Sequence, residues 1–399
     1  MKKDKELIVK GTRNIIILGL VSCFADISSE MVYPLIPLYL TTVFGATPVL
    51  VGIIEGIAES IASLLKVFSG YISDRFQHKK AIAFSGYATG LLYKAALLFA
   101  GSWGGILVAR IIDRFGKGIR TAPRDVMVSE SADKNNMGKA FGIHKMLDMA
   151  GSAIGILLAF ILMKSITANG YKTVFAVSVI PIVIALFLFF FVHEKKEKRK
   201  TVQREHFWKN ISQLDRNLKL YLVITFLFTL GNSSNSFLIL RASDIGFDNS
   251  TTILLYFIYN ITASVLAIPC GRLSDKIGRK RLLVGGYITF SVVYFGFAFC
   301  SSKPIMVLIF VIYGIYTAMT AGAERAFIAE IAPPQLKGTM LGLHSTLAGI
   351  ALLPASVIAG LLWDNIGVYA PFMFGGFLSL LSALILATRL KCTHSASKS

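Results

Sequence analysis

The sequence has little charge for its length. Of its 399 residues, 54% are hydrophobic and only 16% are Asp, Glu, Lys or Arg, and the mean hydropathy is +0.65. A soluble protein of this size carries about a quarter charged residues. The deficit excludes a chain whose whole surface faces water, and it indicates a membrane protein.

Several kinds of functional site are also missing. The four cysteines, Cys23, Cys270, Cys300 and Cys392, have neither paired nor metal-ligand spacing, and His144 and His344 have no second ligand near them in sequence. No Gly-rich phosphate-binding loop occurs, so ATP is not expected to be the direct energy source. No Ser/His/Asp or paired-carboxylate arrangement suits an aqueous catalytic pocket. The sequence therefore predicts neither an enzyme nor a cofactor or metal site.

What the chain does have is a series of apolar runs of roughly 20 residues, each long enough to cross a hydrocarbon core of about 30 Å. Backbone groups in lipid must be satisfied within the segment, which makes these runs helices. The alternating segments of about ten residues that build membrane barrels are lacking. The sequence predicts twelve helices, at 13–43, 48–70, 81–101, 104–128, 138–163, 172–192, 218–241, 251–271, 282–301, 304–331, 338–362 and 367–389.

The charge that is present is strongly basic, with 41 Lys and Arg against 22 Asp and Glu, a net +19. In a soluble chain this excess would suggest nucleic acid. Here the basic residues cluster at helix ends in alternate loops, as in Lys79-Lys80, while the opposite loops are short and nearly uncharged. The positive-inside rule explains this pattern better. We expect a multi-pass protein of the cytoplasmic (inner or plasma) membrane, with both termini in the cytoplasm and no nucleic-acid partner.

One long polar segment lies inside the chain and divides it in two. It predicts an N-terminal six-helix bundle over 1–192, a cytoplasmic linker over 193–217 and a C-terminal six-helix bundle over 218–399. The basic run in this segment is typical of a solvated linker beside anionic membrane lipid. A regulatory or partner-binding role is the alternative.

The two halves share a sequence repeat. Gly70-Tyr71-Ile72-Ser73-Asp74 and Gly271-Arg272-Leu273-Ser274-Asp275 are each followed by a basic cluster. Two further matches lie 200 residues apart: Pro123-Arg124-Asp125 with Ala323-Glu324-Arg325, and Phe141-Gly142-Ile143-His144 with Leu341-Gly342-Leu343-His344. Internal repetition of this kind is typical of secondary transporters.

With these motifs, the chain resembles the major facilitator superfamily over essentially its whole length. The resemblance implies an all-α membrane protein of twelve transmembrane helices, in two pseudo-symmetric six-helix bundles that rock around a central cavity. It also implies that the repeated motif closes the cytoplasmic side; a plain interfacial turn is the alternative. The glycines would let helices approach closely. The predicted cytoplasmic gate comprises Gly70, Asp74, Arg75, Arg124, Asp125, Gly271, Asp275, Glu324 and Arg325.

Charges within the predicted spans point to transport. An ionisable group at membrane depth costs at least about 2.5–3.5 kcal/mol, so it usually faces a cavity and has a partner. Acids spaced i,i+4 occur in the first two spans, and the fourth span carries a charged stripe that includes Lys117. We assign proton or substrate coupling to Asp26, Glu30, Glu55, Glu59, Arg110, Asp113 and Arg114. Desolvation favours the neutral form of a carboxyl group, which makes proton binding feasible, and Asp26 has the best position for it. A static ion-pair network is the alternative.

The second half supplies polar and aromatic groups instead. In the fold that the resemblance implies, spans 1, 4, 7 and 10 line the cavity. We therefore assign the substrate cavity to Asn232, Asn235, Tyr313 and Tyr316, and we add Tyr256 from span 8. Interior aromatic rings often serve packing alone. Pro34 and Pro37 in the first span are expected to open the helix locally.

Together these features predict a monomeric secondary transporter that moves a small organic solute, a drug or metabolite, by proton-coupled export. The alternative is a symporter or uniporter that imports a polar or anionic solute. Exporters of the family tend to have a Gly-Pro step in span 5, and here Ile156 follows Gly155 in its place, which favours the alternative. A third hypothesis is a sensor or scaffold that keeps the fold without transport. Close spacing of Gly151 and Gly155 predicts tight helix packing in any case.

Overall fold

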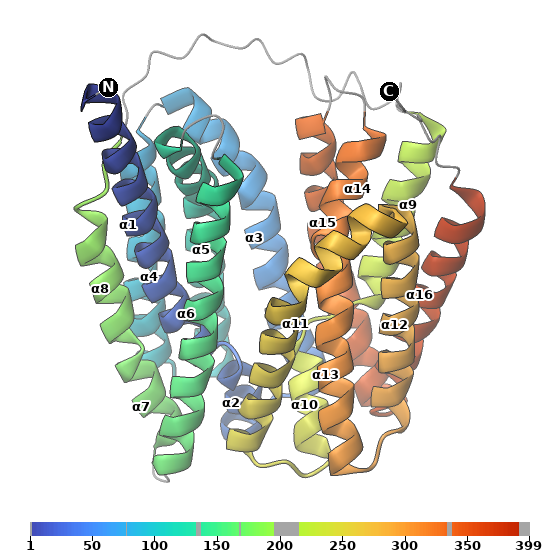
Figure 1. Cartoon of the computed structure of the whole chain (residues 1–399). Helices are drawn as coiled ribbons and strands as arrows, with labels where there is room; N and C mark the ends of the chain where they lie inside the picture. The colour runs from blue at the N-terminus through green and yellow to red at the C-terminus, as the bar shows by residue number, and fades with distance from the viewer. Residues whose placement is uncertain are drawn as a thin grey trace. The chain divides into compact units, whose positions relative to one another are not determined.

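The computed structural model describes the backbone of residues 2–76, 78–132, 137–166, 169–194, 215–332 and 337–390. It describes the side chains of residues 11–65, 78–132, 140–166, 169–194, 215–328, 330–332, 340 and 342–390. Over these residues the chain is helical and has no β-strand (Figure 1). The helices are α1 (Lys2–Val32), α2 (Leu35–Phe44), α3 (Pro48–Phe76), α4 (Lys79–Phe99), α5 (Trp103–Ser131), α6 (Met137–Ser165), α7 (Gly170–Val177), α8 (Val179–Phe189), α9 (Arg216–Gly231), α10 (Ser236–Asp244), α11 (Asn249–Ile277), α12 (Arg279–Phe299), α13 (Lys303–Thr320), α14 (Ala323–Ile331), α15 (Lys337–Asn365) and α16 (Ala370–Arg389).

All twelve predicted spans coincide with helices. Eight correspond to one helix each, and the first, sixth, seventh and tenth spans are each made of two helices. Among the described residues, eleven of these segments are long and apolar enough to cross a membrane. The remaining one is α5, whose polar stripe lowers its hydropathy. The charged residues of α5 therefore explain both its low hydropathy and the coupling role that the sequence predicts for it.

The first span is interrupted where the sequence predicts it. Proline has no N–H to donate and disturbs the preceding turn, so a helix that reaches Pro34 loses part of its hydrogen-bond ladder. The structure ends α1 at Val32 and begins α2 at Leu35, with Pro34 between them. Pro37, which was expected to act in the same way, lies within α2. The seventh span is also broken, between Gly231 and Ser236.

The described residues divide into two compact units. One comprises Met1–Arg199 and Asn235–Phe257, and the other comprises Lys200–Ser234 and Ile258–Ser399, so that α11 is shared between them. In the first unit α1 packs against α6 and α8, and α5 packs against α3 and α4 (Figure 1). In the second, α9 packs against α15 and α16, and α12 packs against α13 and α16. Three pairings of spans in the first half thus recur in the second half. The pairing of spans 1 and 5 recurs as 7 and 11, that of 1 and 6 as 7 and 12, and that of 3 and 4 as 9 and 10. Residues 195–214 of the predicted linker lie outside the described residues.

Tight packing of α1 on α6 confirms the prediction made from Gly151 and Gly155. A Cβ at Gly151 would lie 2.3 Å from the carbonyl oxygen of Cys23, and one at Gly155 would lie 2.6 Å from that of Ile27. Neither backbone oxygen can move aside cheaply, so only glycine fits at these two positions. This contact fixes α1, and with it the acids of the first span, against the rest of the unit.

Candidate functional site

The centre of the first unit is an ion pair removed from solvent. The Arg110 guanidinium on α5 donates to both carboxylate oxygens of Glu55 on α3, from Nε to Oε1 at 2.8 Å and from Nη2 to Oε2 at 2.5 Å. The two side chains are 1% and 0% exposed. A bidentate guanidinium–carboxylate pair has the geometry that best offsets the cost of burying both charges.

A second pair lies one turn further along both helices. Arg114 Nη2 is 2.7 Å from Glu59 Oε1, and Asp113 accepts from Arg110 Nη1 at 3.3 Å. The Tyr33 ring lies beneath both guanidinium groups, with its centroid 5.2 Å from Arg110 Cζ and 5.4 Å from Arg114 Cζ. The structure therefore brings together Glu55, Glu59, Arg110, Asp113 and Arg114, as the sequence predicts, and adds Tyr33, which has no charge to reveal it.

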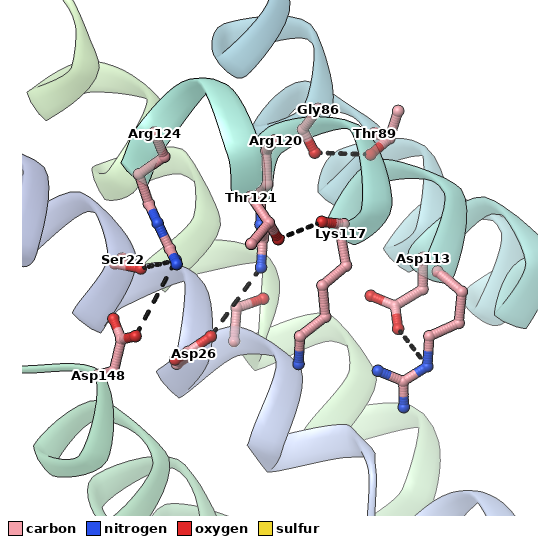
Figure 2. A network of polar contacts seen from close by, with 12 residues as sticks. Ser22, Asp26, Gly86, Thr89, Asp113, Lys117, Arg120, Thr121, Arg124 and Asp148 are labelled. Carbon is pink, nitrogen blue, oxygen red and sulfur yellow. Dashed lines mark hydrogen bonds and ion pairs between the residues drawn. The ribbon is translucent and has the colours of Figure 1, made fainter. Parts of the chain in front are cut away.

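Asp26 has a weaker contact than these acids. Its Oδ1 lies 3.9 Å from Arg120 Nη2 (Figure 2). Arg120 also lies over the Tyr87 ring, 4.5 Å from its centroid. A contact of 3.9 Å is an ion pair without a hydrogen bond, so Asp26 is held less closely than Glu55 and Glu59. Sequence reasoning missed Arg120, although it continues the charged stripe of α5.

The basic groups continue to the last turns of α5. Arg124 donates from Nη1 to Ser22 Oγ at 2.9 Å and from Nη2 to Asp125 Oδ1 at 2.9 Å, and its Nη1 is 3.9 Å from Asp148 Oδ2 (Figure 2). His144 Nδ1 lies 3.7 Å from the same Asp148 oxygen. Sequence reasoning missed Asp148, whose signal was a lone acid inside an apolar span. Arg124 thus links α1, α5 and α6.

A cavity of about 200 Å³ lies beside the paired groups. Its walls carry Glu30, Tyr33, Glu59, Ala62, Arg114, Lys117 and Tyr256. Tyr256, predicted in the substrate cavity, reaches it as part of the first unit, with its ring centroid 5.7 Å from that of Tyr33. Glu30 and Lys117 take part in no hydrogen bond or ion pair through their charged ends within the described part of the chain. Figure 2 shows the Lys117 ammonium group extending away from the contacts around it.

The second unit is aromatic where the first is charged. Asn232, at the end of α9, donates from Nδ2 to Tyr316 Oη at 3.2 Å. Tyr316 lies 4.8 Å from Phe290, and Tyr313 lies 5.2 Å from Tyr259, between ring centroids. Asn235, by contrast, precedes α10 and belongs to the first unit. Asn232, Tyr313 and Tyr316 are therefore close to one another, whereas Asn235 and Tyr256 are grouped with the first unit.

The predicted gate residues have different surroundings. Gly70, Asp74 and Arg75 belong to α3, but their side chains lie outside the described residues. Asp275 Oδ1 is exposed and lies 3.9 Å from Arg279 Nη2, and no described atom lies within 4 Å of a Cβ placed at Gly271. Arg124 and Asp125 form the local pair described above. Their counterparts Glu324 and Arg325 form no ion pair with each other in the described chain; Glu324 instead accepts from Tyr287 Oη at 3.4 Å.

Two pairs of contacts in the basic loops are repeated. Lys79 pairs with Glu130, and Arg279, 200 residues later, pairs with Glu330 at 2.8 Å. Lys80 donates to the carbonyl oxygen of Val192 at 2.6 Å, and Lys280 donates to that of Leu390 at 2.6 Å. Lys80 of α4 and Lys280 of α12 thus place their ammonium groups at the carboxyl ends of α8 and α16, where a cation complements the helix dipole. Over the described residues, no group of three or more His, Cys, Asp or Glu side chains could hold a metal ion.

Comparison with known proteins gives the same fold. The family model of the Major Facilitator Superfamily matches residues 18–240 and 220–399. An uncharacterized MFS-type transporter of Methanocaldococcus jannaschii is 37% identical over 391 residues, 96% of each chain. The quinolone resistance protein NorA of Staphylococcus aureus is 28% identical over 142 residues, 36% of each chain.

Solved structures extend the likeness to the fold of the whole chain. A nucleoside transporter, NupG, matches with a TM-score of 0.78 at 10% identity, over 95% of this chain and 99% of its own. A D-xylose–proton symporter matches with a TM-score of 0.75 at 17% identity, over 94% and 97%. The predicted fold class of twelve helices in two pseudo-symmetric bundles is confirmed, as is the prediction of a membrane transporter and not an enzyme. The chain belongs to the Major Facilitator Superfamily.

Proposed function

We propose that the protein is a proton-coupled secondary transporter that exports a small organic solute, with Asp26 as the group that takes up the proton. The observation that carries the proposal is the contrast between Asp26 and its neighbours. Glu55 is held by two short hydrogen bonds to Arg110, whereas among the described residues Asp26 forms one ion pair, with Arg120 at 3.9 Å. The free energy that a carboxylate gains from a base must be given up when the carboxylate is protonated. Asp26 therefore has less to lose than Glu55.

Protonation of Asp26 has a direct structural consequence. It removes the negative charge facing the Arg120 guanidinium, which among the described residues then keeps the Tyr87 ring beside it. An uncompensated guanidinium within a span is costly, so Arg120 turns to another acid or to solvent. Because Arg120 and Arg124 are one helical turn apart on α5, a change at Asp26 is transmitted to the Arg124–Asp148 contact on α6. Alternating access is driven, in this proposal, by that exchange of partners.

The loop charges predict where the protein resides and how it lies in the membrane. The protein resides in the cytoplasmic membrane as a monomer, with both termini and the linker in the cytoplasm, where basic residues face anionic lipid. Two six-helix bundles, joined by the linker, rock against each other. Asp74, Arg75, Asp275, Arg325 and the other predicted gate residues close the cytoplasmic side, and Asn232, Asn235, Tyr256, Tyr313 and Tyr316 contact the solute.

A flux experiment tests both coupling and direction. Proteoliposomes are loaded inside and out with a defined mixture of amino acids, nucleosides, sugars, organic acids and amphipathic cations, and a pH gradient is imposed. Mass spectrometry then shows which solutes move. Export by antiport accumulates solute on the more acidic side, while symport accumulates it on the more alkaline side. Symport would support the second candidate, import of a polar or anionic solute, which the unpaired Lys117 ammonium favours.

The Asp26→Asn variant decides the role of that residue. It preserves size and polarity but cannot release a proton, so gradient-driven accumulation is expected to fall to the level of empty liposomes. Exchange of labelled solute without a gradient is expected to persist, which shows that the variant is folded. Accumulation at the native rate in Asp26→Asn would refute the assignment. Glu55→Asp, at the carboxylate that two hydrogen bonds to Arg110 hold, serves as the comparison.

A further inference from the structure

The cavity of the first unit contains two opposite charges that do not pair with each other. Glu30 on α1 and Lys117 on α5 both line it, and neither charged end has a hydrogen-bond or ion-pair partner in the part of the chain that the structure describes. Every other acid and base on its walls is paired: Glu59 with Arg114 at 2.7 Å. The Glu30 carboxylate and the Lys117 ammonium attract each other across the cavity, but no direct contact joins them. A ligand that bridges them would satisfy both partly buried charges.

We propose that this cavity binds a small zwitterion, whose ammonium group pairs with Glu30 and whose carboxylate pairs with Lys117. The proposal rests on the proposed transport function and names the substrate class of the same protein. The coupling proton is assigned to Asp26, one turn before Glu30, so that proton and solute use different carboxylates. Tyr33 and Ala62, on the same walls, offer an apolar surface to the carbon atoms between the two charged ends.

Other classes of solute satisfy the cavity less well. An apolar compound would desolvate Glu30 and Lys117 and return no contact to either. An anion alone would pair with Lys117 but would lie beside Glu30 and Glu59, and a cation alone would leave Lys117 uncompensated. A phosphate dianion needs several bases, and Arg114 is already engaged by Glu59. The Lys117 ammonium group therefore matches a solute that carries one carboxylate.

The volume agrees with a small solute. About 200 Å³ is below the roughly 300–1,000 Å³ of sites that enclose drug-sized ligands. An amino acid or a short ω-amino acid is of the appropriate class, because it carries the two charges on a short carbon chain.

The test is a binding series on the purified full-length protein in detergent. The probes are the twenty α-amino acids, β-alanine, 4-aminobutyrate and 5-aminovalerate. Each is compared with its N-acetyl derivative, which has no cation, and its methyl ester, which has no anion. At least one zwitterion is expected to raise the unfolding temperature, and each of its derivatives is expected to bind at least about tenfold more weakly. If no zwitterion shifts the unfolding temperature, or if the derivatives bind equally well, the proposal is wrong.

Two variants assign the charged ends. Glu30→Gln should weaken the zwitterion at least about tenfold while leaving the N-acetyl derivative unchanged, because that derivative never had the ammonium group. Lys117→Gln should weaken the zwitterion similarly and leave the methyl ester unchanged. Lys164→Gln, at an exposed lysine of α6, is the matched control and should bind the whole series as the native protein does. The reverse pattern, or equal loss for all three ligands in either variant, would contradict the assignment. The native-protein series stands by itself if a variant fails to fold.

The two proposals fail in distinguishable ways. If the pH gradient moves solutes of the mixture but none of them is a zwitterion, the substrate class is wrong and proton coupling stands. If a zwitterion binds by the rules above but no pH gradient moves it, the coupling is wrong and the binding site stands.

Discussion

The two halves of the chain share helix pairings but differ in what fills them. On α5 the interior position of Arg110 is occupied by a guanidinium held by Glu55, and the repeat places Phe310 of α13 at the matching position. Phe310 is fully buried against Phe297, with ring centroids 5.3 Å apart. A buried ring needs no counter-charge, whereas a buried guanidinium does. The same position of the helix framework thus holds an ion pair in the first half and a pair of aromatic rings in the second.

The difference is clearest at a residue that both halves keep. Tyr87 and Tyr287 are 200 residues apart, and each follows a glycine that allows close packing, against Arg120 in one half and Thr320 in the other. Tyr87 lies under the Arg120 guanidinium, while Tyr287 donates to Glu324. At this position both halves keep the glycine and the tyrosine on which helix packing depends, and they differ in the group that the tyrosine contacts.

The largest expected effect comes from breaking the buried ion pair of the first half. Glu55→Gln leaves the buried Arg110 guanidinium with only the longer ion pair to Asp113 among the described residues, and it should lower the free energy of unfolding by about 3–5 kcal/mol. The double variant Glu55→Gln/Arg110→Met removes both charges and should recover most of the loss. Unfolding in detergent, followed by circular dichroism, measures both. No recovery in the double variant would show that the pair has a role beyond charge compensation.

The sequence predicted helices better than it predicted contacts. All twelve spans, the Pro34 break and the Gly151–Gly155 packing follow from local rules about apolar length, a missing N–H and a missing Cβ. Two acids of span 2 and two bases of span 4 form ion pairs, Glu55 with Arg110 and Glu59 with Arg114, because an ion inside a span needs a partner. The acids of span 1 do not meet these bases: Asp26 lies near Arg120, and Glu30 has no ion pair among the described residues. Which acid meets which base depends on helix rotation and tilt, and periodicity gives neither. Asp148 and Arg120 were therefore missed, as was the hydrogen bond that Glu324 accepts from Tyr287.

A contact that both halves keep should have unequal strength in the two. The Lys79–Glu130 side chains are 9% and 10% exposed, whereas those of Arg279 and Glu330 are 34% and 49% exposed. Glu130→Gln should therefore lower the free energy of unfolding by about 3 kcal/mol. Glu330→Gln should lower it by at most about 1 kcal/mol, because water screens an exposed pair. The two variants are compared by chemical denaturation, and added salt should reduce the Glu330 effect further. Equal losses would mean that burial does not distinguish the two contacts.

At one matched position of the two halves, helix packing should make both exchanges between glycine and alanine destabilising. The repeat matches Gly151 of α6 with Ala351 of α15, and the alanine is fully buried. Glycine to alanine inside a helix normally stabilises it by about 1 kcal/mol. At Gly151 the new Cβ would meet the Cys23 carbonyl oxygen at 2.3 Å, so Gly151→Ala should instead destabilise the protein by about 1–3 kcal/mol. Ala351→Gly should cost about 1 kcal/mol. Thermal unfolding of the two variants checks this, and a stabilised Gly151→Ala protein would refute the close approach of α1 and α6.

The smallest effect concerns the start of one helix in each half. Thr47 Oγ1 accepts from the backbone N–H of Leu50 at 3.4 Å before α3, and Asp248 Oδ2 accepts from that of Thr251 at 3.1 Å before α11. Hydrogen bonds from Ser250 and Thr251 lower the pKa of Asp248 from 3.8 to about 2. A lowered pKa in the folded state means that the cap stabilises the helix fully above about pH 4, and that this contribution is lost as the pH falls towards 2. When the pH is lowered from 5.5 to 2.5, hydrogen-exchange protection of the first turn of α11 should therefore fall by an amount equivalent to about 1 kcal/mol or less. Protection of the first turn of α3 should change little, because a threonine hydroxyl does not titrate. Asp248→Asn should keep the cap and remove the pH dependence. If α3 and α11 lose protection together, the cause is general loosening of the protein in acid and not this carboxylate.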